Sequence, residues 1–230
     1  LNIHEFLARN NLPMVERVEY QNERWYKFPN ETNPANYLAS VTNILSVAQP
    51  KPLTEYFKRT SYKKQTETLE DAANLGTRIH EIVDKDLQGE QVPEADLLYN
   101  TEDKLENPTI LDLNDWFARW QKLKAEKQIT AEALEVPVVN MKYGYAGTLD
   151  FIGTYMGTPA IFDIKSGFYG VKAGYQLAAY KQAFQAMTGY KEKAAFVTGP
   201  FNPILGELPY EVRDVNPPIR LVGLGLPWNR

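Results

Sequence analysis

Hydrophobic residues along this 230-residue chain recur at two kinds of spacing, which separate predicted helices from predicted strands. Intervals of three and four residues predict helices over residues 1–12, 62–87, 111–127 and 173–188, the last followed by Gly189. Runs of β-branched and aromatic residues predict strands over residues 131–140, 194–198 and 208–212. Residues 145–165 are typical of a hairpin that turns between Met156 and Pro159.

Shorter elements complete the pattern. A small hairpin, expected to be peripheral, spans residues 15–28, and Ser40 is placed to cap a helix that begins near Val41. A second helix is expected over residues 53–60, and the polar residues 88–110 are expected to form a connection with a short helix around 94–99. The central order of helix, three strands, helix and strand predicts an α/β fold, in which a mixed sheet is flanked by helices.

Three charged side chains occupy positions in the predicted 145–165 hairpin where apolar residues are expected. If the turn lies at the centre of this hairpin, antiparallel pairing sets Asp150 roughly opposite Asp163 to Lys165. Asp163 and Lys165 then share one face of the strand, while Phe162 and Ile164 point into the opposite layer. The hairpin is therefore expected to bring two carboxylates and one ammonium group to the same place.

Composition narrows the chemistry that is available. The chain has no cysteine, which excludes disulfides, iron–sulfur clusters and thiolate zinc sites and leaves oxygen and histidine ligands for a metal. Its length suits a single domain, and its net charge of −4 neither supports nor excludes a nucleic-acid partner. There is no apolar run near the length of a membrane span and no signal-like start, so we expect an intracellular (cytoplasmic) protein without a membrane partner.

Five sequence elements, in order, carry a resemblance to a known family: Gly76-x3-His80, Glu135, Gly147-Thr148-Leu149-Asp150, Asp163-Ile164-Lys165 and Gln176-x3-Tyr180. Over about residues 37–198 they resemble the RecB-like branch of the PD-(D/E)XK nuclease superfamily. The segment Ser40-Val41-Thr42-x-Ile44-Leu45 is similar to one in the mitochondrial genome-maintenance exonuclease group and in phage and bacterial relatives. This similarity is compatible with a chain encoded by a phage or prophage. The absence of cysteine separates the chain from the members that hold an iron–sulfur cluster.

The resemblance implies a restriction-endonuclease-like core over residues 40–198. Residues 1–39 would be a helical N-terminal elaboration and residues 199–230 a C-terminal extension of one nuclease domain. DNA is the implied partner, and the oligomeric state stays open.

Phosphodiester hydrolysis requires charge neutralisation on the phosphoryl group, hydroxide near neutral pH and stabilisation of the departing oxygen, and a divalent ion can serve all three needs. Asp150 and Asp163 are the expected ligands of Mg²⁺ or Mn²⁺, and the Ile164 carbonyl can add a backbone ligand. The family pattern implies that His80 is a further metal ligand. Lys165 can orient the attacking water, lower its pKa or stabilise the pentacovalent charge.

Other candidate residues have two open interpretations each. Glu135 either assists catalysis at the metal site or caps a sheet edge. Gln176 and Tyr180 lie one helical turn apart, and the resemblance implies that they contact the DNA backbone and the active site, whereas a packing face is the alternative. Arg78 and Lys172 either touch phosphates of the substrate or are solvated.

These observations lead to the hypothesis of a divalent-metal-dependent deoxyribonuclease. We expect an exonuclease that acts on DNA ends, with single-stranded ends as the favoured substrate. Its expected processes are recombination, repair or replication. The preference for ends comes only from the resemblance. The alternatives are a catalytically silent DNA-binding module, a site-specific endonuclease, and an RNase of the same fold.

Overall fold

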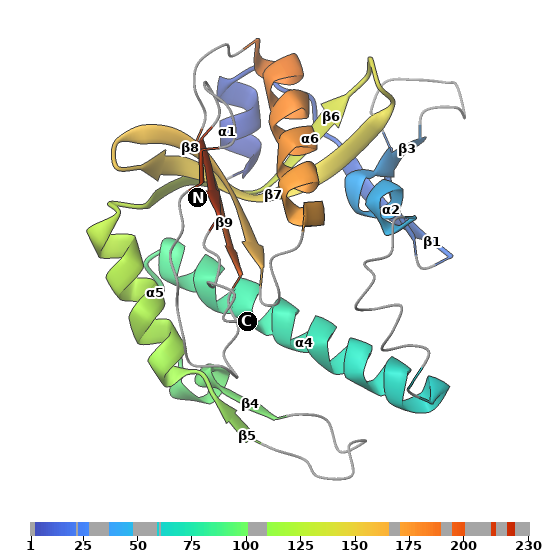
Figure 1. Ribbon diagram of the computed structural model, residues 1–230. Helices are drawn as coiled ribbons and strands as arrows, with labels where there is room; N and C mark the ends of the chain where they lie inside the picture. Colours follow the sequence, from blue (N-terminus) through green and yellow to red (C-terminus); the bar gives the residue numbers. More distant parts are fainter. Residues whose placement is uncertain are drawn as a thin grey trace.

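The computed structural model describes residues 3–21, 23–27, 37–47, 59, 61–100, 110–165, 171–189, 195–200, 213–214 and 220–223. Over these residues the protein is a mixed α/β structure, in which a curled mixed sheet packs against helices on both faces (Figure 1). The expected α/β class is confirmed at this level. Among the described helices, none combines the length and the apolarity that crossing a membrane requires.

The main sheet joins strands from the two ends and the middle of the chain. In spatial order the described strands are β1 (Glu16–Tyr20), β2 (Glu23–Lys27), β3 (Tyr37–Ser40), β7 (Tyr145–Tyr155), β8 (Thr158–Lys165), β9 (Ala195–Pro200), β11 (Arg220–Gly223) and β10 (Arg213–Asp214), and β6 (Thr130–Asn140) also pairs with β7. The pairs β3–β7, β8–β9 and β9–β11 are parallel, whereas the others are antiparallel. Parallel strands need a crossover, and α6 (Val171–Thr188) supplies it between β8 and β9.

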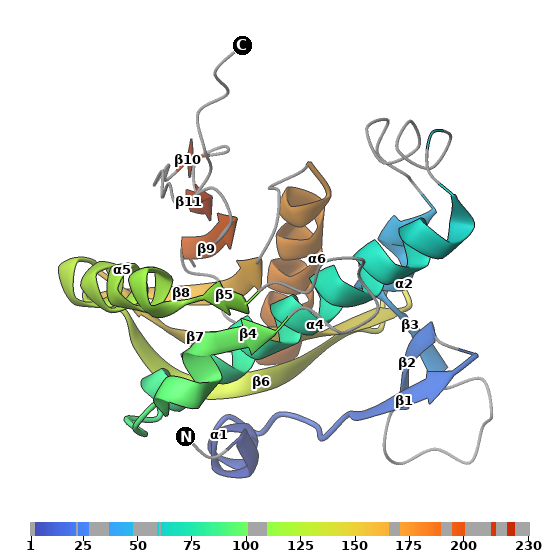
Figure 2. The same cartoon turned by 90° about the horizontal axis from the view of Figure 1, so that it is seen from below.

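Helices divide the interior into cores on the two sides of the sheet. Helix α6 and α1 (Ile3–Arg9) cover one face, with α2 (Val41–Ser46) beside α6, whereas α4 (Tyr62–Leu87) and α5 (Asn114–Glu126) cover the other (Figures 1 and 2). We call these the α6 face and the α4 face. On the α4 face the rings of Phe151 and Phe162 stack with their centroids 4.0 Å apart. Leu177 of α6 is fully buried against the α6 face.

Most of the predicted central elements are confirmed. The predicted order of helix, three strands, helix and strand is present as α5, β6, β7, β8, α6 and β9. Helix α4 has the predicted bounds, and Ser40 caps α2 by accepting a hydrogen bond from the Asn43 amide at 3.0 Å. Gly189 follows α6 with a φ of +66°, a conformation that suits glycine after a helix. The β7–β8 turn consists of Met156 and Gly157, both with positive φ.

The region between α4 and α5 differs from the prediction. The short helix expected around residues 94–99 is present as a 3-10 helix, η1 (Glu94–Leu97), but it leads into β4 (Leu98–Asn100), which pairs with β5 (Ile110–Asp112), and the sequence pattern predicts neither strand. Helix α5 therefore begins at Asn114 and not at residue 111. The cause is local, because the Asp112 carboxylate accepts the Asn114 amide hydrogen bond at 2.8 Å.

Other differences concern strands of the main sheet. The sequence pattern does not predict β3, β10 or β11. The predicted strand over residues 194–198 is found at 195–200. The predicted helix over residues 53–60 and the predicted strand over 208–212 lie outside the described residues, apart from residue 59, which is helical.

One edge of β7 has two different strand partners, which creates a fork in the sheet. The N-terminal end of β7 pairs with β3, and its C-terminal part pairs with β8 as far as Phe151 and Phe162. Among the described strands, residues 147–150 have no partner on this edge, and β8 continues beside β9. Asp150 and Asp163 are the first residues beyond the last β7–β8 pair, so they lie at the inner end of the fork, as the sequence predicts.

At the level of the fork, β6 and β7 both interrupt the normal alternation of side chains. On each strand, two residues separated by three positions pack into the same core on the α6 face: Ala133 and Val136, and Leu149 and Ile152. On β6 the interruption coincides with Glu135, whose φ is +49°. The flanking pairs of the ladder place Glu135 opposite Asp150. Both acidic residues therefore leave the regular pleat at the same level.

Gly153 of β7 lies against a bulge in β6, and its replacement should destabilise the sheet. An added Cβ would lie 1.7 Å from the Thr130 carbonyl oxygen, which belongs to the backbone. We expect Gly153→Ala to lower the free energy of unfolding by roughly 2–4 kcal/mol, measured by chemical denaturation. Gly157→Ala is the control, because its Cβ would meet no atom within 4 Å although φ is +74°, and it should cost about 1 kcal/mol. Equal losses would contradict this account.

Candidate functional site

Asp150 stands at the centre of the candidate site. Its side chain fills the fork, and its Oδ2 atom accepts a hydrogen bond from the Ile164 amide of β8. The residue is 8% exposed, and burial, followed by repulsion from Asp163, raises the pKa of the Asp150 carboxyl well above its ordinary value. Lys165 and the Ile164 amide act in the opposite direction. Asp150 thus replaces a strand partner at the point where β8 separates from β7.

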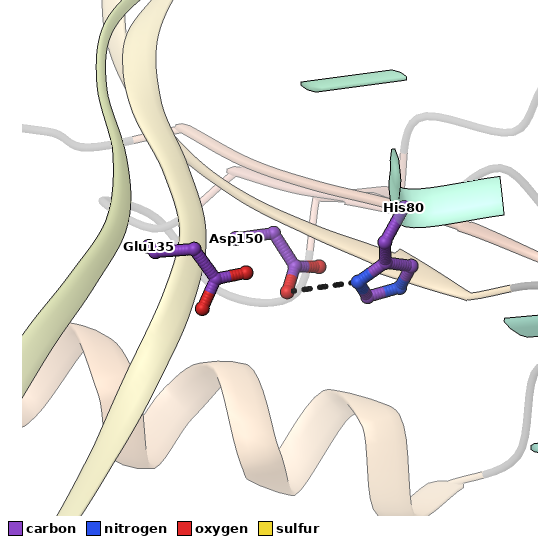
Figure 3. A group of neighbouring side chains, drawn as sticks. All are labelled: His80, Glu135 and Asp150. Carbon is purple, nitrogen blue, oxygen red and sulfur yellow. Dashed lines mark ion pairs between the residues drawn. The ribbon is translucent and has the colours of Figure 1, made fainter. Parts of the chain in front are cut away.

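His80, a residue of α4, approaches Asp150 from the α4 face of the sheet. Its Nε2 atom lies 3.0 Å from the Ile164 carbonyl oxygen, and because a carbonyl can only accept, Nε2 carries the proton. In the neutral ring, the lone pair of Nδ1 is then available 3.6 Å from Asp150 Oδ1 (Figure 3). Two lone pairs facing each other at this distance repel unless a proton or a metal cation lies between them. The tautomer therefore prepares Nδ1 for metal ligation.

Glu135 of β6 completes a group of three potential ligands. One ligand atom from each of His80, Glu135 and Asp150 lies within 4.8 Å of the other two, and the side chains converge in Figure 3. The Glu135 side chain is exposed at the rim, yet neighbouring protein atoms remove enough water to raise its pKa, which His80 opposes. The sequence left two roles open for Glu135. The position of its carboxylate beside His80 and Asp150 suits a role at the metal site better than the capping of a sheet edge.

Asp163 and Lys165 form a separate pair on the α6 side of the fork. Asp163 is 2% exposed, and its Oδ2 atom lies 2.5 Å from the Lys165 ammonium. Its Oδ1 atom accepts a hydrogen bond from Gln176 Nε2 at 3.2 Å. Burial lowers the pKa of Lys165, but the charges of Asp163 and Asp150 outweigh this effect and leave the pKa raised. Lys165 is therefore held as a cation, next to the carboxylates and not among them.

Gln176 and Tyr180 of α6 support this pair from behind. Gln176 Nε2 lies 2.9 Å from the Tyr180 hydroxyl, and both residues are buried. The Tyr180 ring packs on Gly147 so closely that a Cβ there would lie 2.2 Å from Cε1. Gly147 is thus required by the approach of α6. The predicted contacts with DNA remain predictions, and in the structure Gln176 and Tyr180 position Asp163.

The other two predicted phosphate-binding residues lie on α4 and α6. Arg78 of α4 lies 3.2 Å from Asp96 and 3.5 Å from Glu81, so carboxylates already accompany its charge. Lys172 is half-buried in the first turn of α6. Their role in substrate binding stays a prediction.

Asp84 is a site residue that the sequence prediction missed. It lies one helical turn after His80 on α4, and burial raises the pKa of its carboxyl to about 7, with further contributions from Glu135 and Asp150. The spacing His80-x3-Asp84 was the available signal, since residues four positions apart share one face of a helix. Asp84 adds negative potential next to the three possible ligands.

The residues present fit a divalent cation. One imidazole nitrogen and two carboxylates converge, and burial raises the pKa values of Asp84, Glu135 and Asp150, with repulsion from neighbouring carboxylates as a further cause at Asp84 and Asp150. A cation would relieve this repulsion and favour the ionised carboxylates. The Ile164 carbonyl, a predicted metal ligand, accepts the His80 hydrogen bond and so orients the ring. Asp163, also predicted as a ligand, is engaged by Lys165 and Gln176.

Comparison of the chain with protein-family models and with curated proteins finds no match. The function is therefore inferred from the residues of the site.

The raised pKa of Asp84 predicts a pH-dependent loss of stability in the metal-free protein. Between its ordinary value of 3.8 and about 7, the folded state keeps a proton that the unfolded chain releases, so stability falls as pH rises. Asp84→Asn should remove this loss and raise the free energy of unfolding at about pH 8, but change it little at about pH 4. We expect a gain of only about 1–2 kcal/mol, because the Asp84 carboxyl keeps partial contact with water.

The measurement is urea denaturation at several pH values in the presence of a chelator. Asp115→Asn, at an exposed position in the first turn of α5, is the matched control and should follow the wild-type curve. If the stability of Asp84→Asn and of the wild type changed in parallel with pH, a raised pKa of the Asp84 carboxyl would be contradicted.

The Asp163–Lys165 pair should behave as one energetic unit. Asp163→Asn leaves a half-buried ammonium without its partner, and Lys165→Met leaves a buried carboxylate, so each change should cost about 1–3 kcal/mol of unfolding free energy. The double variant should lose clearly less than the sum of the two single losses, measured in a double-mutant cycle. Additive losses would show that the two groups are independent.

Proposed function

We propose that this protein is a divalent-metal-dependent nuclease that hydrolyses phosphodiester bonds of DNA. The observation that carries the proposal is the fork between β7 and β8, where His80, Glu135 and Asp150 converge beside the Asp163–Lys165 pair. A structural ion-pair network would balance its charges. This one keeps excess negative charge on one side and a held ammonium on the other, an arrangement suited to a metal ion and a phosphate.

The fold supports the proposal at a coarser level. A three-stranded meander, a crossover helix and a parallel strand support the proposal of a restriction-endonuclease-like core over residues 40–198, which the sequence resemblance implies. The five elements that carry the resemblance are found on β6, β7, β8 and on helices α4 and α6, around one fork. Residues that are distant in sequence thus meet at one place, which supports a shared role for them in the proposed reaction.

Each group has a distinct part in the proposed reaction. Asp150, Glu135 and His80 Nδ1 would hold the ion, and the Ile164 carbonyl fixes the His80 tautomer that this requires. When bound, the ion supplies charge neutralisation at the phosphate and hydroxide near neutral pH. Lys165 cannot accept the proton of the attacking water while its pKa is raised, so it stabilises the developing charge on the phosphoryl oxygens. Asp163 and Gln176 hold Lys165 in place.

The substrate class follows from this chemistry, whereas the preference for ends does not. A site with one held cation and a divalent ion suits a phosphodiester, and DNA as substrate, with action at its ends, is proposed on the resemblance. Participation in recombination, repair or replication has the same basis.

One assay tests the proposal directly. Linear and circular DNA, in single- and double-stranded forms, and RNA are incubated with the protein in Mg²⁺, Mn²⁺, Ca²⁺ or a chelator. We expect cleavage of linear DNA with Mg²⁺ or Mn²⁺ and none with the chelator. Asp163→Ala and Lys165→Ala should each reduce cleavage at least about a hundredfold, because both disrupt the held cation.

The controls are Asp115→Ala and Lys122→Ala, exposed residues of α5, which should cleave like the wild type. Circular dichroism of all variants checks that the fold is kept. Full activity of either site variant would refute the mechanism. Binding of DNA without cleavage would instead support the silent module, internal cuts in circular DNA an endonuclease, and cleavage of RNA alone an RNase.

A further inference from the structure

The N-terminal hairpin β1–β2, expected to be peripheral, lies against the candidate site. Strand β2 pairs with β3, and β3 pairs with β7 just before the fork. The Tyr26 side chain of β2 is buried, and its hydroxyl lies 2.8 Å from Thr148 Oγ1, two residues before Asp150 on β7. Figure 2 shows β1, β2 and β3 at the end of the sheet near α2. The hairpin is therefore a fixed neighbour of the fork.

The face of the hairpin that borders the site carries two arginines. The β1–β2 ladder pairs Arg17 with Tyr26 and Glu19 with Arg24, and no bulge interrupts it. Because side chains alternate, these four residues share one face. Tyr26 packs with Ala146 and bonds to Thr148, which identifies this face as the one directed toward the site.

Two hydrogen bonds to the Asn43 side chain hold the backbone of Arg24 in place. Asn43 of α2 donates a hydrogen bond from Nδ2 to the Arg24 carbonyl at 2.8 Å, and the Arg24 amide donates to Asn43 Oδ1 at 3.4 Å. The Asn43 amide is bonded to Ser40, which pairs with Ala146 of β7. A short series of contacts thus fixes the position of Arg24 relative to the fork.

The Arg24 guanidinium is available for a ligand. Its side chain is exposed, and Glu19, its partner across the ladder, forms its ion pair with Arg17 at 2.9 Å. Burial is the largest influence on the pKa values of Glu135 and Lys165, and the charge of Arg24 acts on both. The positive field of Arg24 therefore reaches both sides of the fork.

We propose that Arg24 binds a backbone phosphate of the DNA strand whose scissile phosphate lies at the fork. This inference rests on the proposed nuclease function and adds a substrate-binding residue to it. A guanidinium offers two parallel donors that match two phosphate oxygens. The carboxylates of the site repel substrate phosphates, and a cation at the rim offsets this repulsion while touching none of the reacting atoms.

The test measures binding of a fluorescein-labelled oligothymidine by anisotropy over a series of salt concentrations. The parent is the full chain with Asp150→Asn, so that the oligonucleotide is not cleaved. Arg24→Gln in this parent should weaken binding roughly tenfold and reduce the slope of log affinity against log salt by about 0.7, the value for one contact with single-stranded DNA. Arg24→Lys should keep most of the slope.

Lys27→Gln is the matched control, since Lys27 lies on the same strand with its side chain on the opposite face of the hairpin. It should bind like the parent. Glu19→Gln should strengthen binding, because it removes the carboxylate between the two arginines. Damage to the fold is not expected to lower the affinity at one position and raise it at the neighbouring one. Thermal unfolding of each variant checks that the fold is kept.

Equal affinities and equal salt slopes for Arg24→Gln and Lys27→Gln would overturn the inference. If the wild-type protein cleaves DNA in that case, only the role of Arg24 fails and the proposed function stands. If the wild-type protein neither cleaves nor binds DNA, the proposed function fails, and the role of Arg24 fails with it.

Discussion

The antiparallel ladder between β7 and β8 ends at the stacked rings of Phe151 and Phe162, and the Ile164 amide beyond them donates to the Asp150 carboxylate. A side chain thus substitutes for the backbone of a neighbouring strand. Because the amide is satisfied, β8 can leave β7 and continue beside β9 without leaving the Ile164 amide unpaired. The fork, its buried acids and the access of His80 to them all depend on this exchange.

The fork also separates charges that a flat sheet would neutralise. On the α4 side, Asp84, Glu135 and Asp150 gather around His80, and their pKa values are raised. On the α6 side, Lys165 is held by Asp163, which Gln176 supports. A compact ion pair of Asp150 with Lys165 would neutralise both charges. In the proposed mechanism, this separation would let one side bind a cation and the other stabilise negative charge on a phosphate.

Sequence reasoning predicted those parts of the site that depend on local pattern. Alternation along a strand is enough to place Asp163 and Lys165 on one face, and hairpin symmetry sets Asp150 beside Asp163. It could not place Glu135, because a positive φ redirects that side chain out of the regular pleat. It also missed Asp84 and β3, since burial within a site and parallel pairing depend on segments far away in the sequence.

The N-terminal hairpin shows why a segment that looks peripheral can border the candidate site. A parallel strand between β2 and β7 brings residues that precede the implied nuclease core to the edge of the fork. The Asn43 side chain then ties the Arg24 backbone to α2, so the hairpin moves with the sheet and not as a separate arm. In the proposed nuclease, a site that concentrates carboxylates would need nearby positive charge to admit a phosphate chain, and Arg24 would supply it from outside the cluster.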